Sequence, residues 1–218
     1  MMQHRGNLFG GAVSDSGLVK LARIADEQAA KIRWLSMASR RIVADYPNHA
    51  RWICLRVMTG REKAVQKSLE DCDIETLVPM RKGKVYHRRG RVIPAADVPV
   101  LIGYVLVRCV YSTTAMAGFE SVEHVIGVLG GWETPVPIND EYVNKYIEKA
   151  AAGAYDYERP GIIVRPGEKV RITEGPFGGI GGSVVTAPGD GIGDAVIEIM
   201  LLGKPVPMLV PLANLEKL

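Results

Sequence analysis

Six basic side chains lie close together near the middle of this sequence: Arg81, Lys82, Lys84, Arg88, Arg89 and Arg91. No aspartate or glutamate lies between Glu75 and Asp97 to balance them. Clustered cations bind the phosphates of nucleic acids, a contact that carries little information about base sequence. Tyr86 lies within the cluster and could stack on an unpaired base. We therefore predict a nucleic-acid-binding segment here, and the alternative is a solvated hairpin tip.

The other patterns that could support chemistry are incomplete. The glycine-rich stretch 175–182 lacks the Gly-Lys-Ser/Thr ending of a phosphate-binding loop, and Val184 stands where a dinucleotide fingerprint would need a third glycine. The four histidines are far apart and have no cysteine or carboxylate at ligand spacing. Ser183 lacks the flanking residues of a nucleophile elbow. We expect no enzyme activity, no cofactor and no metal site.

The bulk composition is that of an ordinary globular protein. The 218 residues allow two small domains, and the 47% hydrophobic content can fill their cores. No apolar run reaches the roughly 18 residues that span a bilayer, and residues 1–11 lack the apolar region of a secretory signal. We expect a soluble, cytoplasmic monomer with no membrane partner. The odd number of cysteines favours reduced thiols in the core.

Residues 1–48 read as an N-terminal extension that is partly helical. Apolar residues recur at helical spacing from Leu18 to Leu35, and Ser16 is a suitable N-cap. Such a helix packs on its own protein, or it contacts a partner or a nucleic acid. A true start at Met37 is a further alternative.

Residues 49–153 alternate between strand and helix patterns. Strands are predicted at 52–57, 74–80, 101–110 and 124–129. Helices are predicted after a capping box at Thr59–Glu62, over 113–122, and from an N-cap at Asn139 to about 152. This alternation indicates an α/β sandwich, a sheet with helices on its faces. Residues 154–162 have no periodicity and are predicted to be a linker.

Residues 163–218 have a different character. Apolar and polar residues alternate with period two over 169–173, 195–201 and 205–210, and glycine-proline turns separate these runs. Short strands with frequent turns are typical of a small antiparallel β-barrel. The fold class predicted for the whole chain is therefore α+β.

Two segments resemble the NusG family of transcription factors. Residues 166–184, with the sequence PGEKVRITEGPFGGIGGSV, resemble its KOW motif. Residues 52–153 are similar to its N-terminal domain, in the segments WICL (52–55), LVP (77–79), GYVLV (103–107) and PVPI (135–138). The family usually has Phe-Pro-Gly-Tyr where this chain has Leu101-Ile102-Gly103-Tyr104. This departure and the long extension favour a specialised paralogue similar to RfaH over a housekeeping factor.

The resemblance implies a transcription elongation factor that modulates pausing, termination or antitermination. An apolar concavity of the N-terminal domain would bind the clamp helices of RNA polymerase. The resemblance places that concavity at Trp52, Met58, Leu101 and Tyr104, and the alternative is that these are core residues. The basic segment would contact upstream or non-template DNA.

The resemblance also implies that the KOW barrel, an SH3-like module, recruits a small-subunit ribosomal protein or Rho. Phe177 is the expected anchor, with Ile172 and Ile180 beside it, and the alternative for Ile172 is a core position. RfaH hides its KOW domain as a helical hairpin. Here Gly178, Gly179, Gly181 and Gly182 would each cost a helix roughly 1 kcal/mol relative to alanine, so we predict a stable barrel. The rival hypothesis is a translation-associated RNA-binding KOW protein, which would not need the α/β half.

Overall fold

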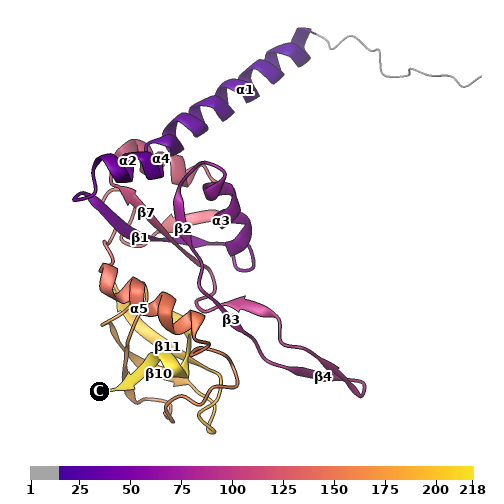
Figure 1. The fold of residues 1–218 in the computed structure, drawn as a ribbon, viewed down its shortest axis with the longest axis vertical. Helices are drawn as coiled ribbons and strands as arrows, with labels where there is room; N and C mark the ends of the chain where they lie inside the picture. Colours follow the sequence, from indigo (N-terminus) through magenta and orange to yellow (C-terminus); the bar gives the residue numbers. More distant parts are fainter. Residues whose placement is uncertain (1–14) are drawn as a thin grey trace, which may run out of the picture.

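A four-stranded antiparallel sheet forms the centre of the N-terminal part of the computed structural model, which describes residues 15–218 (Figure 1). Its strands are β1 (Ala50–Val57), β2 (Glu75–Leu77), β7 (Tyr104–Val110) and β8 (Val125–Val128), in the order β2-β7-β1-β8. Most side chains of β1 and β7 are buried on both faces of the sheet, which explains their almost continuous apolar sequences.

The two faces of this sheet are covered by different elements. Side chains alternate along a strand, so Ile53 and Leu55 lie on one face of β1 and Trp52 and Cys54 on the other. The first face packs against the helices α3 (Glu62–Glu70) and α4 (Thr113–Glu120). The second face meets α5 (Asp140–Ala151) and the C-terminal part of the chain. The predicted cap of α5 is confirmed, because Asn139 Oδ1 accepts a hydrogen bond from the amide of Glu141.

Helix α1 (Asp15–Ser36) projects away from the sheet and precedes the short helix α2 (Arg40–Asp45) (Figure 1). Its last turn crosses α4 closely: a Cβ on Gly118 would lie 3.0 Å from the backbone at Trp34 and Leu35. Leu35 is buried, but Leu18, Leu21 and Ile32 are exposed. The expectation that this helix packs on its own protein is therefore correct only for its last turn.

A long arm leaves the N-terminal part between β2 and β7. Its base is the pair β3 (Met80–Lys82) and β6 (Asp97–Pro99), and its outer half is the pair β4 (Tyr86–Arg88) and β5 (Arg91–Ile93) (Figure 1). Arg89 and Gly90 form the turn with φ values of 49° and 76°. Two consecutive positive φ values are the geometry of a tight two-residue hairpin turn. The arm carries the basic segment.

The C-terminal part is a five-stranded antiparallel sheet. Its strands are β9 (Lys169–Ile172), β10 (Gly181–Thr186), β11 (Asp194–Leu201), β12 (Lys204–Pro211) and β13 (Leu215–Lys217), in the order β12-β11-β10-β9-β13, and the 3-10 helix η1 (Leu212–Asn214) precedes β13. Val170, Ile172 and Ile197 are fully buried in its centre. The α+β class and the strand-rich C-terminal sheet expected of a KOW-like barrel are confirmed.

The capping box predicted at Thr59–Glu62 is wrong. Helix α3 begins at Glu62 after Arg61, and no side chain caps its first turn. Glu62 is buried instead, and its Oε1 accepts a hydrogen bond of 2.7 Å from the amide of Gly103. Because the loop before β7 covers the start of α3, the carboxylate stabilises a distant amide. The same loop includes Leu101, so β7 begins at Tyr104 and not at Leu101 as predicted.

Candidate functional site

The face of the first sheet that meets α5 and the C-terminal part brings together three of the four expected polymerase-binding residues. Trp52 and Leu101 are buried, Tyr104 is half-buried, and all three belong to one apolar cluster. Burial raises the pKa of the Tyr104 hydroxyl. Met58 lies beyond the end of β1, is 51% exposed and does not join the cluster. Three residues of the predicted set therefore share one apolar face.

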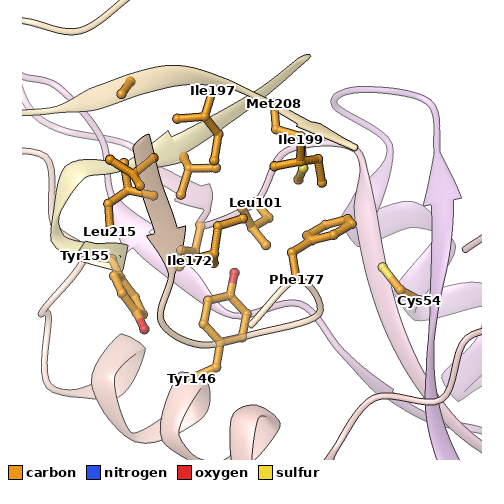
Figure 2. Packing of buried hydrophobic residues seen from close by; sticks show 14 of the residues in the cluster. Cys54, Leu101, Tyr146, Tyr155, Ile172, Phe177, Ile197, Ile199, Met208 and Leu215 are labelled. Atoms are coloured by element: carbon orange, nitrogen blue, oxygen red, sulfur yellow. The ribbon is translucent and has the colours of Figure 1, made fainter. Parts of the chain in front are cut away.

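The C-terminal barrel covers this face. Phe177, the expected anchor of the barrel, is fully buried, and its ring packs edge-on against Tyr104 with 5.0 Å between centroids and 78° between planes. Figure 2 shows Phe177 and Leu101, from different parts of the chain, pointing into one cluster with Ile199 and Met208. An aromatic pair of this kind contributes about 0.5–1.5 kcal/mol beyond the burial of its area. The two surfaces that were expected to bind separate partners therefore cover each other.

The loop that carries Phe177 docks on α5. The amide of Gly175 donates a hydrogen bond of 3.2 Å to the carbonyl of Tyr142. A Cβ on Gly178 would lie 2.8 Å from the Tyr142 ring, so a larger residue there would push the loop away from the helix. Ile180 is half-buried beside the loop, and Ile172 is fully buried in the barrel, as its core alternative predicted.

A buried carboxylate, Glu174, joins α5 to the barrel. Lys149 of α5 forms an ion pair with Glu174, and the Tyr155 hydroxyl donates a hydrogen bond of 3.2 Å to Glu174 Oε2. Burial, with the negative charge of Glu174, raises the pKa of Tyr155. Because Glu174 is only 6% exposed, these partners supply the charge balance that water would otherwise provide.

An ion pair joins the base of the arm to the barrel. Arg81 Nη2 lies 2.7 Å from Asp194 Oδ2, and the two side chains are only 4% and 13% exposed. Arg81 Nη1 also donates to the carbonyl of Tyr155 at 3.2 Å. Arg81 Nε and Asp194 Oδ1 are buried without a hydrogen-bond partner. Unpaired buried polar atoms cost about 1–3 kcal/mol each, so this contact holds the two parts together imperfectly.

The segment predicted as a linker runs along the base of the arm. The amide of Tyr157 donates to the carbonyl of Lys82, and the amide of Lys82 donates to Asp156 Oδ1 at 2.8 Å. The ammonium group of Lys84 lies 5.5 Å from the centre of the Tyr157 ring. The connection between the two parts is therefore packed against the arm along part of its length.

The outer half of the arm presents cations and aromatic surface together. Arg88 lies opposite Arg91, and Tyr86 lies opposite Ile93, so the four side chains share one face of the hairpin. All four side chains are exposed, and Tyr86 is 60% exposed. Lys82, Lys84 and Arg89 are exposed as well. Of the six predicted nucleic-acid-binding cations, Arg81 is the one that the structure buries.

The sequence did not point to Asp194, Glu174 or Tyr155. Arg81 and Asp194 are 113 positions apart, and neither residue type is unusual in its own segment. The one available signal was the lack of any acid around the basic segment, because a buried arginine there needs a carboxylate from elsewhere in the chain.

The three cysteines are free thiols that lie in different environments. Cys54 faces the barrel and Cys109 faces the helices, on opposite sides of the same sheet. Burial raises the pKa of both thiols, that of Cys109 to about 12. Within residues 15–218 no helix is long and apolar enough to cross a membrane, and no three His, Cys, Asp or Glu side chains are placed to hold a metal ion.

Comparisons with known proteins found one family model and several relatives that are similar to this chain. Residues 50–147 match the family model described as "Transcription termination factor nusG". The transcription termination/antitermination protein NusG of Escherichia coli K12 is 28% identical over 177 residues, covering 77% of this chain and 96% of that protein. NusG of Buchnera aphidicola is 29% identical over 144 residues, covering 62% and 78%.

A solved structure described as "Domain interaction in Thermotoga maritima NusG" is also similar. It is 20% identical, covers 78% of this chain and 97% of its own, and has a TM-score of 0.43. The family-model match lies on the N-terminal sheet, and the relatives extend the match over most of the chain. Residues 50–147 therefore form a NusG-type domain, and the chain is similar to NusG proteins over most of its length.

Proposed function

We propose that this chain is a cytoplasmic, non-enzymatic transcription factor that binds RNA polymerase and modulates pausing, termination or antitermination. Its relatives are transcription termination/antitermination proteins. The observation that carries the proposal is the apolar sheet face with Trp52, Leu101 and Tyr104, which a separate domain covers. A helical element of polymerase could pack on such a face through its aromatic side chains.

In this proposal the barrel and the polymerase compete for the same face. Phe177 packs on Tyr104, so a polymerase helix can reach Tyr104 only after the barrel has moved. Binding then includes the cost of separating the two parts, and the apparent affinity equals the affinity of the open form multiplied by the fraction of molecules that are open. Separation also exposes Phe177 and Ile180, which would bind a small-subunit ribosomal protein or Rho.

The arm adds contact with upstream or non-template DNA. No acid lies between Glu75 and Asp97 in the sequence of the arm, and its Tyr86 ring is exposed and available for stacking. Phosphate contacts of this kind add affinity that falls as salt rises.

A substitution in the docking loop tests the proposal. Gly178→Ala should push the loop off Tyr142, because its Cβ would lie 2.8 Å from that ring. In a pull-down with core RNA polymerase, we expect this variant to bind on the order of tenfold more tightly than the unchanged chain.

Gly189→Ala is the matched control, because its Cβ would meet no atom within 4 Å. It should bind like the unchanged chain. If the chain and both variants all ignore core polymerase but bind ribosomal RNA, the chain is a translation-associated KOW protein and the proposal fails.

A further inference from the structure

Arg81 is the cation of the arm that the barrel neutralises. The other five basic residues of the arm are exposed, whereas the Arg81 side chain is 4% exposed and pairs with Asp194 of β11. The charge on the arm therefore depends on where the barrel is. With the barrel in place, Asp194 masks one cation, and with the barrel removed, all six can face solvent.

The contact between Arg81 and Asp194 leaves hydrogen-bonding groups unsatisfied, so another anion could replace Asp194. Each residue keeps one buried polar atom without a partner, Arg81 Nε and Asp194 Oδ1. A buried ion pair stabilises a structure only when its remaining donors and acceptors are satisfied. A competing anion that satisfied both free faces of the guanidinium would therefore bind Arg81 at least as well as Asp194 does.

An open cavity lies next to this ion pair, between the arm and the barrel. Its volume is about 540 Å³, and Arg81, Lys84 and Tyr86 line it on the arm side. Asp194 and Leu209 form the barrel wall. If the barrel leaves, the arm side remains as two cations and an aromatic ring, continuous with Arg88 and Arg91 on the outer hairpin.

We propose that Asp194 occupies a phosphate-binding site of Arg81, and that a nucleic-acid strand and the barrel exclude each other there. A strand that runs along the arm places a phosphate on Arg81 only when Asp194 has withdrawn. Nucleic acid then favours the open form, and opening strengthens nucleic-acid binding by the same factor, because coupling between two equilibria is reciprocal.

The ligand class is a polymer of phosphates with unstacked bases. A row of cations from Arg81 to Arg91 matches repeated phosphates, and Tyr86 offers a ring for stacking. Inorganic phosphate carries the same kind of charge as a nucleic-acid strand but cannot span several cations, so it serves as the comparison ligand. This inference rests on the proposed nucleic-acid role of the arm.

The two buried thiols report opening in the full chain. Cys54 lies on the face that the barrel covers, near Phe177 in Figure 2, whereas Cys109 lies under the helices on the other face. In a Cys72→Ala background, we expect a single-stranded DNA oligonucleotide to raise the rate of Cys54 alkylation on the order of tenfold. Cys109 should stay protected, which shows that the sheet remains folded, and inorganic phosphate at matched ionic strength should have no effect.

Two variants assign the effect to the ion pair. Asp194→Asn should raise both DNA affinity and basal Cys54 alkylation, on the order of tenfold, whereas Asp190→Asn, an exposed acid of the same barrel, should change neither. The double variant Arg81→Gln, Asp194→Asn should still bind DNA through the outer hairpin, but DNA should no longer accelerate Cys54 alkylation.

Equal DNA affinity of Asp194→Asn and Asp190→Asn would overturn the inference, and so would DNA-driven alkylation that persists in the double variant. The triple variant Arg88→Ala, Arg89→Ala, Arg91→Ala separates this failure from failure of the proposed function. If it binds DNA as well as the unchanged chain, the role of the arm is wrong. If it binds DNA more weakly, yet DNA leaves Cys54 of the unchanged chain protected, only the competition at Arg81 is wrong.

Discussion

At the scale of residues, the contact between Tyr104 and Phe177 joins the N-terminal sheet to the barrel. The Phe177 ring is apolar and the Tyr104 ring is amphipathic, and both kinds of ring are common in binding sites. In the closed arrangement each ring shields the other from solvent. Cys54, Leu101 and Ile199 extend the same contact, so the interface has the apolar character of a domain core.

Replacing Tyr104 distinguishes its contact with the barrel from its proposed contact with polymerase. In the Gly178→Ala background, where the barrel is already displaced, Tyr104→Ala should weaken binding to core polymerase by about 30-fold, the effect typical of a buried aromatic anchor. Tyr46→Ala, which removes a 55% exposed tyrosine far along the sequence, is the control and should have no effect. Equilibrium titration of labelled variants measures both, and equal affinities would exclude Tyr104 from the polymerase-binding face.

At the scale of elements, the arm and the segment after α5 act together. The segment hydrogen-bonds along β3 through Tyr157 and Asp156, and Arg81 of the same strand reaches the barrel. The outer hairpin, from Tyr86 to Ile93, is free of these contacts. The inner half of the arm is therefore part of the domain interface, and the outer half is exposed.

The outer hairpin has a measurable electrostatic signature. The triple variant Arg88→Ala, Arg89→Ala, Arg91→Ala should weaken binding to elongation complexes and reduce the slope of log affinity against log salt by about 2–3, because each lost phosphate contact removes about 0.7–0.9. The variant Arg61→Ala, Lys63→Ala, Lys67→Ala removes three exposed cations around α3 and controls for net charge. An unchanged slope in the hairpin variant would remove the arm from the nucleic-acid interface.

Local patterns predicted most of these elements, because their causes are local. The cap at Asn139 and the period-two strands of the barrel each depend on neighbouring residues. Glu62 shows the limit: its partner, the Gly103 amide, comes from a loop 41 positions away. The burial of Phe177 and Arg81 could not be predicted in this way, since it depends on how two sheets from distant parts of the sequence meet.

At the scale of the whole molecule, the four-stranded sheet, α5 and the five-stranded sheet pack together. Helix α5 lies between the sheets in Figure 1, and α1 and the arm extend from the N-terminal part. The closed form hides the surfaces proposed for polymerase and for the barrel's partner, and it neutralises Arg81. A single separation would expose all three.

The barrel should keep its fold after separation. Its residues Val170, Ile172 and Ile197 are fully buried, and four glycines in the loop and β10 disfavour a helix. Circular dichroism of residues 160–218 alone should show mainly strand. A spectrum dominated by helix would show that the barrel depends on the N-terminal part.

The central claim is that the barrel and RNA polymerase compete for the face of Trp52, Leu101 and Tyr104. The most direct measurement compares the affinity of core polymerase for the full chain and for residues 1–153. We predict that the shorter chain binds on the order of tenfold more tightly, and that adding residues 160–218 in trans reverses part of the gain. Equal affinities, or loss of binding when the barrel is removed, would contradict the account.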